Sequence, residues 1–159
     1  MPDDVPDDRP AEWTRGAHHV TTDRAVVARL LPQALALLHD THWGGGLTAE
    51  LLARAARGSL CFAVVDDAGR LAGFARAVTD LATYAYLTDV VIAPAARGRG
   101  LGAWLVRCIL AHPQLQGLRR VALLTRDAPA LYERLGFVAG PPPGRTYMER
   151  RPGERRPDV

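Results

Sequence analysis

The amino-acid sequence predicts an α/β fold in which helices cover a mixed β-sheet, and three observations support this expectation. The chain has 159 residues, the size of one ordinary domain with a sizeable core. Hydrophobic residues make up 48% of it and charged residues 23%, as in folded water-soluble domains, so wholesale disorder is excluded. Segments with strand and helix periodicity follow one another in the order β-α-α-β-β-β-α-β-α-β-β, which is typical of a sheet covered by helices.

The first half of this order begins with a strand over residues 17–22. Asp23 is placed to cap a helix whose apolar residues recur with helical spacing, and Pro32 within that helix predicts a kink or a break. A glycine-rich loop, 42–46, then leads to a second helix over residues 48–57.

The second half is richer in strands. Two β-rich runs flank an Asp-Asp-Ala-Gly turn, which is typical of a hairpin, and a third long strand ends at Pro94. Asp127 is expected to cap the last helix. The expected ranges are strands 60–65, 71–79, 83–93 and 120–125, helices 100–112 and 127–135, and a final strand pair 137–138 and 146–150 around a Pro-Pro-Pro loop.

The charge pattern and the cysteine content argue against several classes of protein. All 20 basic residues are Arg, and the formal net charge is only +3, too small to indicate nucleic-acid binding. Abundant Arg, Ala, Gly and Pro are typical of a GC-rich coding sequence, so we expect a bacterial source. No apolar run reaches the roughly 18 residues of a membrane span, and the Asp- and Pro-rich start is unlike a secretory leader, so we expect a cytoplasmic protein. Cys61 and Cys108 are expected to be reduced, buried thiols.

We expect one domain over residues 15–150. A mobile acidic tail, 1–14, precedes it and a mobile basic tail, 151–159, follows it, because both ends are rich in Pro and in charges of one sign. The histidines show no metal-binding spacing, so no metal site is expected.

The strongest functional signal is a glycine-rich loop between the third long strand and the following helix, with the sequence Pro-Ala-Ala-Arg-Gly-Arg-Gly-Leu-Gly from Pro94 to Gly102. Glycine lets the backbone approach a ligand closely and adopt positive φ without strain. The N–H groups at the start of the helix and the charges of Arg97 and Arg99 then favour a pyrophosphate. A Walker A loop is excluded because the sequence has no Lys, and a dinucleotide site is disfavoured because a basic pair stands where an acidic residue is needed.

Two motifs resemble the GNAT superfamily of acetyltransferases. Residues 97–102, Arg-Gly-Arg-Gly-Leu-Gly, match its Arg/Gln-x-x-Gly-x-Gly/Ala signature, and residues 131–137, Leu-Tyr-Glu-Arg-Leu-Gly-Phe, match its Tyr-x-x-x-Gly-Phe segment. The resemblance covers residues 17–150 and, through segments 71–76 and 86–90, extends to a branch without an assigned substrate. It implies a central mixed, mostly antiparallel sheet of six or seven strands flanked by about four helices, with a splay between the strands before and after the glycine-loop helix.

The resemblance also implies direct transfer of an acetyl group from acetyl-CoA to a primary amine, without a covalent enzyme intermediate. The loop amides would hold the pyrophosphate of coenzyme A, and the preceding strand would pair with its pantetheine arm and polarise the thioester carbonyl through a backbone N–H. Tyr132 is expected to protonate the departing thiolate, since a phenol is protonated at neutral pH; core packing is the alternative. The expected cofactor-binding residues are Val90, Val91, Ile92, Arg97, Gly98, Arg99, Gly100, Leu101, Gly102 and Tyr132.

Asp89 is the expected base or amine anchor, because a carboxylate on an otherwise apolar strand needs a partner. The alternative is a structural pair with Arg76 or Arg126. Trp43 lies where the resemblance implies a substrate lid, and simple packing explains it equally well. The expected substrate-binding residues are Trp43, Arg76, Asp80, Tyr84, Asp89 and Arg126.

We therefore expect an acetyl-CoA-dependent N-acetyltransferase that acts on a small-molecule amine, as a monomer or homodimer, with no metal, nucleic acid or membrane involved. The acidic residues Asp80 and Asp89 favour a cationic acceptor such as a polyamine, an amino sugar or the amine of an amino acid. Two alternatives stay open: a non-catalytic module that binds or senses acyl-CoA, and an enzyme that acetylates a protein or an aminoacyl-tRNA.

Overall fold

The computed structural model describes residues 9–151, and within this range the chain forms six strands and four α-helices. The strands are β1 (Glu12–Arg15), β2 (His18–Thr21), β3 (Leu60–Asp66), β4 (Leu71–Thr79), β5 (Tyr84–Ile92) and β6 (Arg120–Leu123). The α-helices are α1 (Arg24–His39), α2 (Ala49–Arg57), α3 (Leu101–Leu110) and α4 (Pro129–Glu133), with short 3-10 turns at Pro94–Ala96 and Pro113–Leu115. The chain divides into two compact units, residues 1–126 with the sheet and α1 to α3, and residues 127–159 with α4.

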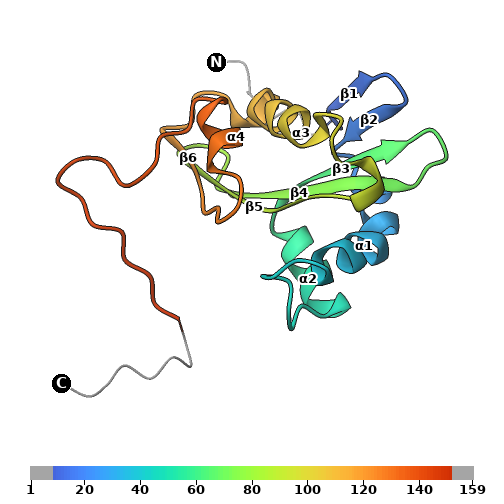
Figure 1. The fold of residues 1–159 in the computed structure, drawn as a ribbon, viewed down its shortest axis with the longest axis horizontal. Helices are drawn as coiled ribbons and strands as arrows, with labels where there is room; N and C mark the ends of the chain where they lie inside the picture. The colour runs from blue at the N-terminus through green and yellow to red at the C-terminus, as the bar shows by residue number, and fades with distance from the viewer. Residues whose placement is uncertain (1–8, 152–159) are drawn as a thin grey trace, which may run out of the picture. The chain divides into compact units, whose positions relative to one another are not determined.

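The six strands lie in one sheet in chain order, β1-β2-β3-β4-β5-β6. Neighbouring strands pair antiparallel except β5 and β6, which are parallel. Within the first unit, α1 and α2 cover one face of the sheet and α3 covers the other (Figure 1). This arrangement confirms the expected mixed, mostly antiparallel sheet flanked by helices.

Alternating side chains along the central strands build a core on each face of the sheet. In β3, Ala63 and Val65 are buried in one hydrophobic cluster with Leu30 of α1. Because residues one apart in a strand point to opposite faces, Phe62 belongs to the other face. Its side chain is fully buried, and its ring stacks on Trp13 of β1 with 6.5 Å between centroids.

The pairing between β5 and its neighbours changes halfway along the strand. β5 pairs with β6 only over residues 84–87, and beyond them it pairs with β4 alone, which confirms the expected splay. In the same stretch the register between β4 and β5 shifts, so that Asp89 and Val90 together lie opposite Ala75, as in a β-bulge. Asp89 has a φ of 56°, in the left-handed region that Asp tolerates better than most residues. The bulge thus re-aims the Asp89 side chain.

The N-terminal end of the fold differs from the expectation. Residues 12–14, expected within a mobile tail over 1–14, belong to β1, which pairs with β2 and packs Trp13 against Phe62. A strand of four residues in which only Trp13 turns inward has too little periodicity to be identified from sequence. Residues 1–8 of the expected tail lie outside the described residues.

Two expected features of the helices can be compared with the structure. α1 runs without a break at Pro32, with buried residues on both sides of the proline and contacts to β3 and β4, and a kink at this residue stays a prediction. Asp127 does not cap α4: the N-cap residue is Ala128, without a side-chain capping bond. The helix begins instead at Pro129, since proline suits the first helical position, where its missing N–H has no internal partner to lose.

The expected final strand pair, 137–138 and 146–150, is not formed. The three prolines between these segments donate no N–H, and Val138 and Met148 are 89% and 84% exposed, so no buried apolar face favours pairing. Residues 152–159 of the expected basic tail, 151–159, lie outside the described residues, and the single domain over 15–150 stays a prediction. No helix within residues 9–151 has the length and apolar character needed to cross a membrane.

Candidate active site

The glycine loop has the backbone geometry that its sequence predicts. After β5 the chain makes a short 3-10 turn, and Gly98 and Gly100 then adopt φ values of 75° and 70° before α3 begins at Leu101. These left-handed conformations are strained for residues with a Cβ. Gly100 is the N-cap of α3, and no side chain among the described residues, 9–151, caps the helix. An added Cβ at Gly98 would meet no atom within 4 Å, whereas one at Gly100 would lie 3.5 Å from the nearest guanidinium nitrogens of Arg15.

Three arginines lie in or against this loop. Arg97 donates from Nε to the carbonyl oxygen of Ile92 at 3.1 Å, which ties the start of the loop to the end of β5. Arg99 is exposed. Arg15, from β1, donates from Nη1 to the carbonyl oxygen of Gly100 at 3.1 Å. Sequence reasoning missed Arg15, because 85 residues separate it from Gly100 and because residues 12–14 of its strand fell within the expected mobile tail.

The second motif, residues 131–137, forms the C-terminal end of α4 and the turn that follows it, in the second unit. Gly136, with a φ of 90°, lets the chain reverse so that the Phe137 N–H donates to the carbonyl oxygen of Tyr132 at 3.1 Å. The two aromatic rings then meet edge to face with 5.7 Å between centroids. Tyr132 is buried, and burial raises the pKa of its phenol above the ordinary value of 10.0, so the hydroxyl keeps its proton at neutral pH.

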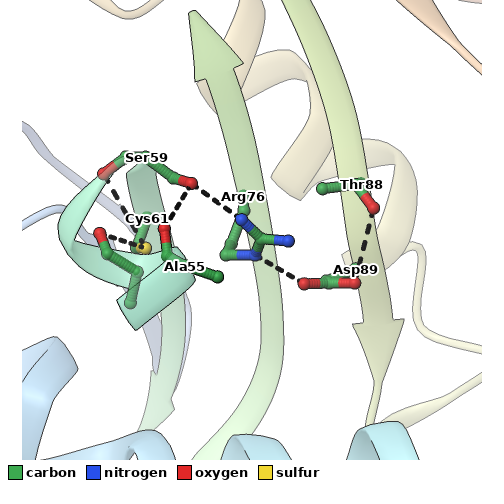
Figure 2. Close-up of polar contacts among 7 residues, drawn as sticks. Ala55, Ser59, Cys61, Arg76, Thr88 and Asp89 are labelled. Atoms are coloured by element: carbon green, nitrogen blue, oxygen red, sulfur yellow. Dashed lines mark hydrogen bonds and ion pairs between the residues drawn. The ribbon is translucent and has the colours of Figure 1, made fainter. Parts of the chain in front are cut away.

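Asp89 and Arg76 form an ion pair on adjacent strands (Figure 2). Arg76 Nε donates to Asp89 Oδ2 at 2.5 Å, and both side chains are almost covered, at 13% and 12% exposed. Arg76 Nη1 donates to Ser59 Oγ at 2.7 Å, and Ser59 Oγ donates to the carbonyl oxygen of Ala55 at 2.7 Å. The structure thus contains the Arg76 pair expected as one alternative for Asp89. The role of Ser59 could not be predicted from the sequence, because this serine lies between a helix and a strand and belongs to no motif.

A cavity of about 220 Å³ brings three of the expected acceptor residues together. Trp43, Arg76 and Asp89 line it. The remaining walls are the glycines of the loop at residues 42–46 and apolar residues of α1, α2 and the segment between these helices: Leu38, Gly44, Gly45, Gly46, Leu47 and Leu51. The loop approaches α1 closely, since an added Cβ at Gly44 would lie 1.8 Å from the carbonyl oxygen of Leu38. Trp43 is 50% exposed and meets His42 edge to face.

The other expected acceptor residues do not line this cavity. Asp80 closes the turn between β4 and β5 by accepting hydrogen bonds from the Ala82, Thr83 and Tyr84 amides and the Thr83 hydroxyl. These bonds, led by the Thr83 hydroxyl, hold the pKa of Asp80 well below its ordinary value. Tyr84 is 39% exposed at the start of β5, and Arg126 follows β6 at the end of the first unit.

A larger cavity, of about 660 Å³, lies beside α1, α2 and the start of β3, and none of the expected site residues lines it. Cys61 is on its wall, and burial raises the pKa of this thiol to about 11, which keeps it protonated. Cys61 and Cys108 are both buried and form no disulfide, as expected. Among residues 9–151, no three His, Cys, Asp or Glu side chains gather as a metal site would require.

The chain resembles acetyltransferases in sequence and in fold. The acetyltransferase (GNAT) domain family matches residues 57–139. The chain is 34% identical to a Gibberella zeae protein named as an acetyltransferase of inferred activity, over 78% of this chain and 80% of that protein. It is 43% identical to a GNAT-family acetyltransferase of inferred activity from Xanthomonas campestris, whose crystal structure superposes with a TM-score of 0.74 and covers 84% of this chain and 92% of that one.

A Mycobacterium tuberculosis protein whose structure contains CoA shares the fold, with a TM-score of 0.62 and 22% identity over 75% of this chain and 70% of that one. The loop geometry, the second motif, the sheet and these relatives together place the chain in the GNAT family of acetyltransferases.

Proposed function

We propose that this protein transfers an acetyl group from acetyl-CoA to a primary amine of a small molecule. One observation carries the assignment. β5 leads directly from the bulge at Asp89, on the wall of the small cavity, into the glycine loop, which begins at Pro94. A ligand anchored at the loop by its phosphates and lying along residues 90–92 therefore ends beside the cavity in which an amine is held.

The loop fits the pyrophosphate of coenzyme A. Gly98 and Gly100 have the positive φ values of an open turn, the start of α3 has no side-chain cap, and Arg15, Arg97 and Arg99 supply positive charge around it. Helix N–H groups and the helix dipole favour an anion at this position. Acetyl-CoA supplies an activated acetyl group as its thioester.

The residues of the chain divide the proton transfers between them. Asp89 accepts the proton that the acceptor ammonium loses, directly or through water, so that the amine nitrogen forms a bond with the carbonyl carbon as the carbon–sulfur bond breaks. A backbone N–H at the bulge of β5, where one residue lies outside regular pairing, polarises the carbonyl. Tyr132 donates its phenolic proton to the departing thiolate, and burial favours the protonated phenol that this role needs.

Calorimetry and thermal shift with CoA and acetyl-CoA test the proposed cofactor site at the glycine loop. A ligand at a hundredfold excess over its Kd stabilises the folded state by about 2.7 kcal/mol. Gly100→Val should abolish this shift. Gly117→Val is the matched control, because Gly117 has a similar φ of 74° in an exposed turn outside the loop. Absence of binding to the wild-type protein would refute an acetyl-CoA site.

Tyr132→Phe tests the proposed role of Tyr132 as the general acid. The variant keeps the ring that meets Phe137 and removes only the hydroxyl. Loss of a general acid typically lowers turnover by 10²–10⁴-fold, so kcat for acetyl transfer should fall by roughly this factor in a variant that still binds CoA. Tight CoA binding by the wild-type protein without turnover of any amine would instead favour a non-catalytic CoA-binding module.

A further inference from the structure

We propose that the acceptor is a free α-amino acid with a compact apolar side chain, whose carboxylate binds Arg76 and whose amine faces Asp89. This assignment rests on the proposed acetyl transfer and names its substrate class. Three properties of the small cavity carry it: the charges on its wall, the unused hydrogen-bonding capacity of the ion pair, and its size.

The charges on the cavity wall cancel. Among the described residues that line it, Arg76 and Asp89 are the only charged ones, and they are paired with each other. Asp80, the second carboxylate expected to attract a cation, accepts four hydrogen bonds in the β4–β5 turn and lies outside the lining. A polyamine therefore finds no excess negative charge, whereas a zwitterion finds one partner for each of its charges.

Each member of the pair keeps one side for a ligand. Arg76 uses Nε for Asp89 and Nη1 for Ser59, and its Nη2 has no protein partner within residues 9–151. In that range His112 Nε2 is the only buried side-chain nitrogen or oxygen without a partner, so Nη2 is not closed off from solvent. Asp89 uses Oδ2 for Arg76, while Oδ1 has only the Thr88 hydroxyl, at a long 3.4 Å.

The guanidinium is held in place before a ligand arrives. Ser59 is itself fixed by its bond to the Ala55 carbonyl, so two of the three guanidinium nitrogens are anchored, one by β5 and one by the turn between α2 and β3 (Figure 2). A guanidinium that is already oriented loses little conformational freedom when it binds a carboxylate. Arg76 is thus a binding residue and Ser59 a positioning residue.

The size and lining of the cavity select the rest of the acceptor. A volume of about 220 Å³ is below the usual 300–1,000 Å³ of drug-sized sites, which favours a small acceptor. Leu38, Leu47 and Leu51 supply apolar walls, and the half-exposed Trp43 lies at the loop. A compact aliphatic side chain fits such walls.

A matched panel on the wild-type protein tests the assignment. For leucine, methionine and valine, acetylation of the free amino acid is compared with that of its carboxamide and its decarboxylated amine, with spermidine as the polycation. Thiol release gives kcat/KM, and thermal shift in the presence of CoA gives acceptor binding without turnover. The free amino acids should lead in both readouts by at least about tenfold, the effect of one charge-assisted hydrogen bond.

Variants of Arg76 then separate binding from folding. Arg76→Lys keeps the charge but loses the planar set of guanidinium donors, and Arg76→Gln removes the charge. In both variants the ratio of kcat/KM for the free amino acid to kcat/KM for its carboxamide should fall toward one, because KM for the free amino acid rises. Ser59→Ala should reduce the preference partly. Arg70→Gln is the control, because Arg70 forms an exposed pair with Asp66 away from the cavity and should leave the preference unchanged.

The outcomes separate this assignment from the proposed reaction. Equal or faster acetylation of carboxamides, simple amines or spermidine overturns the amino-acid assignment and leaves the acetyltransferase intact. An unchanged acid preference in folded Arg76→Gln, with its CoA shift retained, overturns the role of Arg76. Failure to bind acetyl-CoA or to acetylate any amine overturns the reaction itself, and the acceptor assignment falls with it.

Discussion

At the scale of single residues, the loop that carries Trp43 depends on Gly44. The chain passes so close to the end of α1 that an added Cβ at Gly44 would lie 1.8 Å from the Leu38 carbonyl oxygen, while at Gly45 it would meet no atom within 4 Å. Gly44→Ala should therefore destabilise the fold by about 1–3 kcal/mol, the usual cost of overpacking, and should displace the wall of the small cavity.

Gly45→Ala is the matched control and should leave stability unchanged or raise it by about 0.4–1 kcal/mol, because alanine restricts the unfolded chain. Urea denaturation of both variants measures the difference. Equal stabilities for Gly44→Ala and Gly45→Ala would show that the loop is not held against α1 as described.

Among the site residues, those in local sequence motifs could be predicted, whereas contacts between distant residues could not. The loop glycines and the Tyr132 segment are local patterns, so the positive φ values at Gly98 and Gly100 could be predicted. The Arg76–Asp89 pair joins residues 13 apart across a hairpin, and it could be predicted only as one alternative. Contacts such as Arg15 with Gly100 depend on the folded topology and have no local signature.

At the scale of elements, α2 is a short helix whose start is fixed by one side chain. Thr48 Oγ1 accepts a hydrogen bond from the Leu51 amide at 3.1 Å, which satisfies one of the unpaired N–H groups at the helix start. Thr48→Ala should lower the free energy of unfolding by about 1 kcal/mol, while Thr48→Ser, which keeps the hydroxyl, should cost little. Chemical denaturation checks both variants, and an equal loss in the two would place the effect in packing instead of capping.

Capping chemistry also explains where the elements could be predicted. Thr48 and Asp23 stand directly before long apolar patterns, and the structure places them as N-caps of α2 and α1. Asp127 is the same residue type as Asp23, but it does not become an N-cap because Pro129, two residues later, sets the start of α4. The strands 60–66 and 71–79 follow clear apolar runs, whereas β1 has four residues and one inward side chain.

At the scale of the whole molecule, one aromatic cluster ties the N-terminal hairpin to the end of α3. Trp13 of β1 stacks on Phe62 of β3, and the ring of His112 meets Phe62 edge to face at 5.6 Å between centroids. His112 is only 2% exposed, and its Nδ1 accepts a hydrogen bond from the Gln114 amide at 3.2 Å. Its other nitrogen, Nε2, has no hydrogen-bond partner among residues 9–151, so this described part of the molecule offers no acceptor that would stabilise a protonated imidazole.

The stability of the molecule should therefore depend on pH through His112. Burial lowers the pKa of this imidazole below its ordinary value of 6.5, so the unfolded chain binds the proton more tightly than the folded one. The contribution of a neutral His112 is complete above about pH 6.5 and is lost as the pH falls through the folded pKa, by up to about 1.4 kcal/mol per pH unit. Urea midpoints between about pH 7.5 and about pH 5 measure this fall, while carboxylates with lowered pKa values, such as Asp66 and Asp80, act only in more acidic solution. His112→Phe keeps a ring against Phe62 and should flatten the profile; an equally steep fall in that variant would assign the acid sensitivity to other groups.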